Sequence, residues 1–214
     1  MINEFKKDVM ETYEVSDLRL LHYFFGIKIW QNDNGIFISE DILKKYKMQG
    51  CKAVSTSLMP NEKLKLENGA KKVVPIVYRS LVGSLLYLTA TRPDIMFAAS
   101  LLSRYMNSPS YLCLAAAKRV LRYIKGTNDY GIWYKLVEDF KLIGFTNSDW
   151  VGCLEDKKST SGYAFSLGSG LCSWSIKEQR VVTLSSTEAE YVAPRRAVAQ
   201  AVWLQRILED IGEK

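Results

Sequence analysis

The sequence has little of what metal-bound, disulfide-bonded and membrane-spanning proteins require. It has one histidine, His22, and its four cysteines stand far apart without a CxxC pair. Because zinc sites gather Cys and His ligands at short spacings, this pattern argues against bound zinc. No apolar run is long enough to span a bilayer, and the first residues lack the apolar segment of a signal peptide. We therefore expect an intracellular protein, cytoplasmic or nuclear and not secreted, with reduced cysteines and no membrane partner.

The composition is that of a globular protein with a moderate basic excess. Of the 214 residues, 48% are apolar and 24% charged, which fits one or two ordinary domains. There are 29 Lys and Arg against 23 Asp and Glu, a formal net charge of +6. A basic excess favours polyanionic partners, but many globular domains are mildly basic without binding them.

The first block, residues 1–50, predicts a helix, a β-hairpin and a second short helix. The hairpin consists of a long apolar strand, a polar turn at residues 31–35 and a second strand. In the short helix, Ile42, Leu43 and Tyr46 are expected on the apolar side. The four segments, in order, are NEFKKDVMETY, LRLLHYFFGIKIW, IFIS and EDILKKYKM.

The second block, residues 51–137, predicts a long connection followed by three helices. Residues 49–76 hold few large apolar side chains and are interrupted by proline and glycine. Beyond them, helical spacing recurs three times, with a break at Arg92 and Pro93 and an end at Gly126. The three segments are YRSLVGSLLYLTA, IMFAASLLSRYM and LAAAKRVLRYIKGT.

The third helix of this block carries a basic stripe beside its apolar face. Such a stripe can follow the phosphates of nucleic acid. The alternative is the solvated face of an ordinary amphipathic helix, which the spacing alone favours. The basic residues are Lys118, Arg119, Arg122 and Lys125.

The third block, residues 138–214, predicts a three-stranded antiparallel sheet followed by one long helix. The strand FKLIGFTNSDW places Phe145, Asn147 and Asp149 on one face. Residues 161–178 predict a hairpin that turns at Gly168, Ser169 and Gly170. The helix SSTEAEYVAPRRAVAQAVWLQRILEDIG follows, opened by Ser and Thr.

In this order, the segments resemble consecutive pieces of one family. They look like the Pol polyprotein of copia-type LTR retrotransposons, in the form typical of plants, from the end of the reverse transcriptase into the first half of the ribonuclease H domain. The resemblance covers nearly the whole chain. It is carried by LLHYFFGIKI, YRSLVGSLLYLTATRPDIMFAASLLSRYM, AAKRVLRYIKGTNDYGIWY, FTNSDWVG, KKSTSGYAF, SWSIKEQ and VTLSSTEAEYVA.

The resemblance implies an α+β fold in three parts. Residues 1–50 match a hairpin and helix remnant of the polymerase palm, residues 51–137 a helical thumb-like or connection region, and residues 138–214 the first half of a ribonuclease H-like domain. The parent family copies RNA into DNA and hydrolyses the RNA strand of the hybrid with two Mg²⁺ or Mn²⁺ ions. The implied partners are an RNA/DNA hybrid or other nucleic acid, bound through the basic helix, and other Pol segments.

The resemblance also implies the candidate catalytic and metal-binding residues. The family's first metal-binding acid, in its T-D-S-D strand, corresponds to Asn147, and the second Glu of T-E-A-E corresponds to Glu190. An amide brings no charge with which to gather divalent metals. Asp149 is the substitute on the same strand face, although it lies about 6–7 Å further along. The catalytic and metal residues expected are therefore Glu190 and Asp149, with no metal bound tightly.

Helical geometry gives Glu188 and Glu190 different roles. Glu190 shares a face with Ala197 and the apolar residues that follow it, whereas Glu188 can form an S-x-x-E capping box with Ser185. A rival register pairs Thr187 with Glu190 and makes Glu190 the cap. Pro194, four residues after Glu190, either kinks the helix there or starts a new one.

Whether this chain is an enzyme stays open at this point. It contains no Tyr-Xaa-Asp-Asp polymerase motif, and no acidic motif follows Ile211. The strand that contains Phe145 is expected to have an unpaired edge. We expect a fragment that catalyses neither step of the parent. The alternatives are a nucleic-acid-binding protein without catalysis and a non-functional globular relic.

Overall fold

The computed structural model describes most of the chain. The described residues are 2–14, 22–24, 27–39, 42–59, 64, 69–136, 141–150 and 157–212. Some expected features lie outside these ranges, namely the start of the first strand, most of residues 60–68 in the connection, and Cys153.

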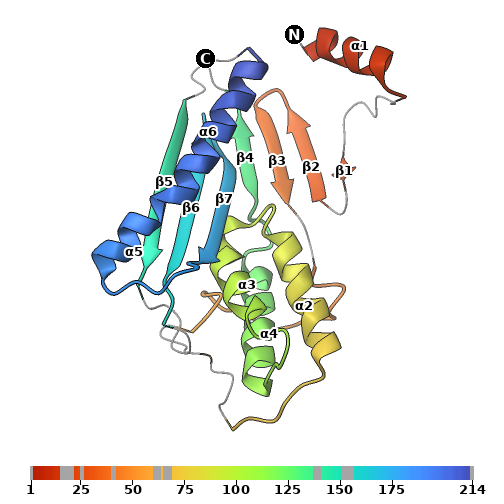
Figure 1. Cartoon of the computed structure of the whole chain (residues 1–214). Coiled ribbons are helices and arrows are strands. Elements are labelled where there is room, and N and C mark those ends of the chain that lie inside the picture. Colours follow the sequence, from red (N-terminus) through yellow and green to blue (C-terminus); the bar gives the residue numbers. More distant parts are fainter. Residues whose placement is uncertain are drawn as a thin grey trace.

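The chain folds as an α+β protein with two antiparallel sheets and a group of helices at one end of the strands (Figure 1). None of the helices described is long and apolar enough to traverse a bilayer. The helical elements are α1 (Ile2–Thr12), α2 (Pro75–Leu88), η1 (Pro93–Ile95), α3 (Met96–Ser103), α4 (Tyr111–Gly126), α5 (Ser186–Val192) and α6 (Pro194–Asp210). The strands are β1 (Tyr23–Phe24), β2 (Ile27–Asn32), β3 (Gly35–Ser39), β4 (Ile132–Lys135), β5 (Leu142–Asp149), β6 (Thr160–Leu167) and β7 (Gly170–Glu178).

The first sheet has the strand order β1-β2-β3-β4. The expected hairpin is present, because β2 and β3 pair around a turn at Asp33 and Asn34. The Asn32 Oδ1 atom accepts a hydrogen bond from Asn34 N at 2.9 Å and stabilises this turn. The expectation of one continuous strand before the turn is wrong. β1 folds back on β2, with Tyr23 opposite Lys28. The apolar residues of this segment do not alternate regularly with polar ones, so their pattern does not distinguish one strand from two.

The short helix expected over EDILKKYKM is also wrong. The described part of this segment forms consecutive turns, in which Lys47 has a left-handed backbone with a φ of 53°. A hydrogen bond from Met48 N to Leu43 O, 3.0 Å long, closes the last turn. The apolar side was correctly identified, because Ile42 and Leu43 are buried and Tyr46 packs against the main core.

The three helices α2, α3 and α4 enclose the main hydrophobic core. Each buries one apolar stripe, and the stripe on α2 includes Leu81, Leu85 and Leu88, all fully or almost fully buried. Each such side chain contributes about 1.5–3 kcal/mol by leaving water. Ser110 caps the start of α4, because its Oγ accepts a hydrogen bond from Cys113 N at 3.4 Å. Helical periodicity therefore predicted this part of the fold correctly.

A buried arginine joins the turn before α3 to the end of α4. The side chain of Arg92 is 2% exposed and forms a two-pronged ion pair with Asp94, at 2.9 and 2.7 Å. It also donates to Thr127 O at 2.9 Å and to Thr127 Oγ1 at 2.6 Å. Its guanidinium lies over the rings of Tyr123 and Tyr130. The charge is therefore fully compensated in a place where an unpaired charge would be strongly destabilising.

The second sheet has the order β5-β6-β7 and is antiparallel throughout. The expected hairpin is confirmed, since β6 and β7 are joined by a two-residue turn at Gly168 and Ser169. Gly168 has a φ of 57°, the left-handed conformation that such tight turns require. Within the described residues β5 pairs with β6 alone, so it stands at an edge of this sheet.

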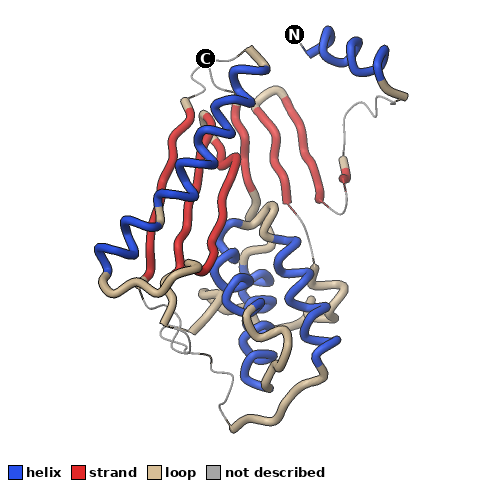
Figure 2. The backbone as a smooth tube through the Cα atoms, viewed as in Figure 1, coloured by secondary structure: helices blue, strands red, loops and turns tan. Residues whose placement is uncertain are grey.

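The two sheets lie side by side, as Figure 2 shows, with β4 next to β7. Their contact is polar at the turn of the second hairpin, where Tyr134 Oη donates to Leu171 O at 2.7 Å and Lys135 N donates to Ser169 Oγ at 2.8 Å. β4 also pairs with β3, for example Ile36 with Tyr134. The end of the second sequence block thus completes the sheet that the first block begins, whereas the division at residues 50 and 137 stays a prediction.

The second sheet has helices on both of its faces. On one face, Trp174 Nε1 donates to Thr89 O at 2.9 Å, and Arg104, just after α3, pairs with Glu178 at 3.0 Å. On the other face, α5 and α6 run across β5 and β6 (Figure 1). The sheet is therefore held against the helical core by hydrogen bonds from its side chains, and it presents its other face to α5 and α6.

Replacing Asp94 by Asn should destabilise the fold in a pH-dependent way. Burial alone would raise the pKa of Asp94, but the hydrogen bonds and charge of Arg92, with the Tyr123 hydroxyl, hold the pKa below its ordinary value. The Asp94 carboxylate therefore stabilises the fold fully above its unfolded-state pKa of about 3.9, and this contribution is lost as the pH falls through the lower folded-state value.

We expect Asp94→Asn to lower the free energy of unfolding by about 1.5–3 kcal/mol at pH 7, the range for hydrogen bonds to charged groups. The deficit should shrink toward zero in acid. Urea unfolding of both proteins at pH 7 and at acidic pH measures it. An equal deficit at both values would show that the carboxylate charge contributes nothing.

Candidate functional site

β5 holds the two side chains expected at the first acidic position and its neighbour. Side chains alternate along the strand, so Phe145, Asn147 and Asp149 share one face, as expected. All three are exposed, Phe145 to 62%. The Asn147 Oδ1 atom accepts a hydrogen bond from Ser148 N at 2.8 Å. The single oxygen of the amide thus already accepts a hydrogen bond from the backbone.

The start of α5 settles which glutamate caps the helix. The Ser185 Oγ atom accepts a hydrogen bond from Glu188 N at 3.1 Å, and Glu188 Oε2 accepts one from Leu184 N at 2.7 Å. The Ser185–Glu188 register is therefore confirmed, and the rival register with Thr187 is not the one formed. Glu190 is left out of the cap and is exposed.

A buried glutamine fixes α5 to the sheet. The Gln179 side chain is 5% exposed, and its Nε2 atom donates to Ser161 Oγ at 2.7 Å and to Ala189 O at 2.9 Å. It also lies 3.5 Å from Ser148 Oγ. Ser148 and Ser161 are cross-strand partners, so they share a face of the sheet. That face is the one on which α5 packs.

This arrangement separates the candidate acids. Because Asn147 and Asp149 alternate with Ser148, their side chains lie on the face opposite the one that α5 covers. Glu190 belongs to α5, so the structure does not bring it together with Asp149. Among the described residues, no group of three or more His, Cys, Asp or Glu is placed to hold a metal ion. The residues present do not fit a two-metal site, so no catalytic step through Mg²⁺ or Mn²⁺ follows from them; whether either ion binds stays a prediction.

Pro194 divides the expected long helix into two, which corrects that expectation. α5 ends at Val192, and α6 begins with Pro194 in its first turn. Ala193 keeps a helical backbone and donates to Ala189 O at 3.1 Å, but Pro194 has no N–H to donate to Glu190 O. Of the two alternatives for this proline, the helical restart is the one observed.

The basic residues of α4 fall into two pairs. Arg119 Nη2 donates to Thr56 Oγ1 at 2.9 Å, and Arg122 Nε donates to Lys52 O at 2.8 Å. These two side chains hold the long connection against α4. Lys118 and Lys125 make no hydrogen bond or ion pair with any described part of the chain.

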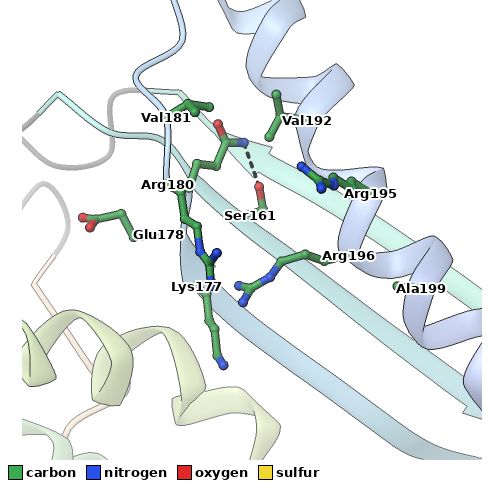
Figure 3. Close-up of a pocket in the computed structure, with 10 residues that line it drawn as sticks. Ser161, Lys177, Glu178, Arg180, Val181, Val192, Arg195, Arg196 and Ala199 are labelled. Atoms are coloured by element: carbon green, nitrogen blue, oxygen red, sulfur yellow. Dashed lines mark hydrogen bonds between the residues drawn. The ribbon is translucent and has the colours of Figure 1, made fainter.

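A second basic cluster was missed by sequence reasoning. A cavity of about 300 Å³ lies between the end of β7 and the α5–α6 junction (Figure 3). The dipeptide Arg195–Arg196 was a visible signal, but helical spacing cannot show which strand it meets. The cationic side chains that line the cavity are Lys177, Arg180, Arg195 and Arg196.

Known proteins similar to this chain include large polyproteins and a shorter protein. The retrovirus-related Pol polyproteins from transposons RE1 and RE2 of Arabidopsis thaliana are each 38% identical, over 96% and 94% of this chain respectively. The uncharacterized mitochondrial protein AtMg00810 of the same plant is 38% identical over 95% of this chain, which covers 86% of that protein. The chain spans 14% of the length of each of the two polyproteins.

No family model matches the sequence, and no solved structure matches it.

Substituting Pro194 by Ala should join α5 to α6. The new amide can donate to Glu190 O, and one added hydrogen bond contributes about 0.5–1.5 kcal/mol to the free energy of unfolding. We expect a higher midpoint of thermal unfolding and more helical signal in far-UV circular dichroism. A lower midpoint would mean that the break itself is needed for α6 to pack on the sheet.

Proposed function

Because this chain belongs to the retrovirus-related Pol polyproteins of plant copia-type transposons, we propose that it is their segment from the end of the reverse transcriptase into the first half of the ribonuclease H domain. Two features support this placement. The order β5-β6-β7 followed by helices on one face of the sheet agrees with what the sequence resemblance implies for ribonuclease H. The β2–β3 hairpin and the helices α2, α3 and α4 precede it in the order implied for the palm and thumb-like parts.

We further propose that this chain does not hydrolyse the RNA strand of a hybrid. The observation that carries this proposal is the placement of Asn147. A neutral amide stands at the position of the first acid, and its side chain lies with Asp149 on the face turned away from α5 and Glu190. Two-metal hydrolysis needs clustered carboxylates to gather the ions and steady the leaving oxygen.

The partner that we propose is nucleic acid, an RNA/DNA hybrid or another form, contacted on α4 by Lys118 and Lys125. Both lysines are available, whereas Arg119 and Arg122 already hold the connection. The net charge of +6 is in keeping with a polyanionic partner. The alternative of a non-functional relic predicts no such binding, and other segments of Pol remain a further proposed partner.

An assay of hybrid cleavage tests the proposal that this chain does not hydrolyse RNA. The purified chain, incubated in Mg²⁺ or Mn²⁺ with a hybrid whose RNA strand is end-labelled, should give no products above a protein-free blank. Asn147→Asp alone should not restore cleavage, because the new carboxylate would still face away from Glu190. A ribonuclease H of known activity serves as the positive control. Metal-dependent cleavage that Glu190→Gln abolishes would refute the proposal.

Binding to the same hybrid is measured by fluorescence anisotropy over a range of salt concentrations. The double variant Lys118→Glu, Lys125→Glu should bind more weakly and show a shallower salt dependence, because each lost phosphate contact lowers the slope by about 0.9. Lys141→Glu, just before β5, is a single charge-reversal control outside α4 and should change binding little. If the unmodified chain does not bind the hybrid at low salt, the alternative of a non-functional relic explains the result better.

A further inference from the structure

The cavity between β7 and α6 is lined by an excess of positive charge. Lys177 comes from β7, Arg180 from the loop that follows, and Arg195 and Arg196 from the first turn of α6. All four side chains belong to exposed residues, so their charged groups are accessible to a ligand. Ser161, which is hydrogen-bonded to the buried glutamine that fixes α5, also lines the cavity.

No acid of the described chain compensates these four charges. None of the four makes an ion pair or a side-chain hydrogen bond within the described ranges. Glu178 is the one acid among the described residues that line the cavity, and it pairs with Arg104 at 3.0 Å and Lys158 at 3.7 Å. Figure 3 shows its carboxylate directed away from the other side chains. The acid is therefore engaged elsewhere.

Two arginines converge across the cavity. In Figure 3 the side chains of Arg180 and Arg196 extend toward each other from the loop and from α6. Like charges that face each other repel, and an anion between them converts this repulsion into attraction. A guanidinium presents its N–H groups as a fork, and this fork matches the paired oxygens of a phosphate.

We propose that this cavity binds the phosphate groups of a nucleic-acid backbone. The four cations come from a strand, a loop and a helix. A polynucleotide offers a charge about every 3.4 Å along each strand, so successive phosphates can meet different side chains. The inference rests on the proposed nucleic-acid partner and adds to it a second contact surface, separate from α4.

The test compares two variants that each affect α6. The double variant Arg180→Gln, Arg196→Gln neutralises the converging pair, and Arg206→Gln removes a positive charge further along the same helix, about 15 Å away. Anisotropy of a labelled RNA/DNA hybrid over a salt series gives both the affinity and the slope. We expect the double variant to bind about tenfold more weakly, with the slope reduced by about 1.8, and Arg206→Gln to bind within about twofold of the unmodified chain.

Each of the three following outcomes would overturn the proposal that the cavity binds backbone phosphates. An equal loss per charge removed, for the pair and for Arg206→Gln, would indicate diffuse charge rather than a site. A loss confined to Lys118→Glu, Lys125→Glu would keep the nucleic-acid partner and remove this cavity from it. No binding by the unmodified chain would refute both the nucleic-acid partner and the role of this cavity. The cleavage assay would still test separately whether the chain hydrolyses RNA.

Two further measurements complete the design. Thermal unfolding of the double variant shows whether it folds, and its midpoint should not fall, because the substitutions remove a repulsion. Inorganic phosphate, added at constant ionic strength, distinguishes a backbone from a free anion. Millimolar phosphate should displace the hybrid only weakly; complete displacement would mean that the cavity is a site for a single free phosphate.

Discussion

The fold depends on the ion pair between Arg92 and Asp94. Arg92 is buried where three segments meet: the turn after α2, the start of η1 and the end of α4. A buried charge tolerates no loss of partners, so the carboxylate, the Thr127 carbonyl and the Thr127 hydroxyl are all fixed by it. Because Thr89, in the same turn, accepts the hydrogen bond of Trp174, the position of the second sheet is tied to this turn as well.

Polar contacts help to set the positions of the remaining described parts. Arg104, just after α3, pairs with Glu178 of β7, and Gln179, just after β7, donates to Ala189 O of α5. Such bonds fix orientation because their geometry is strict, whereas apolar contact alone would allow sliding. The relative orientation of α5 and β5 follows from Gln179, and with it the separation of Glu190 from Asp149.

The sequence predicted those features that depend on neighbours along the chain. The helices around Leu81, the hairpin at Gly168 and the cap at Ser185 follow from local periodicity and turn chemistry. The pairing of β1 with β2 was not predicted because the apolar residues before the hairpin turn do not alternate with polar ones. The helix predicted over EDILKKYKM was wrong because its described part forms turns that end in the left-handed Lys47. Arg92 was interpreted only as a helix break, since its partner Thr127 is 35 positions away. The arginines that line the cavity were missed for the same reason.

The pairing of β3 with β4 constrains how the chain can fold. Ile36 of β3 pairs with Tyr134 of β4, and the helices α2, α3 and α4 lie between these two strands in the sequence. The β2–β3 hairpin is therefore synthesised well before β4. Closing a loop of this length is entropically unfavourable unless α2, α3 and α4 have already shortened the distance between its ends. During synthesis, the hairpin therefore emerges before α2, α3 and α4, and one of its edges stays unpaired until these helices bring β4 beside it.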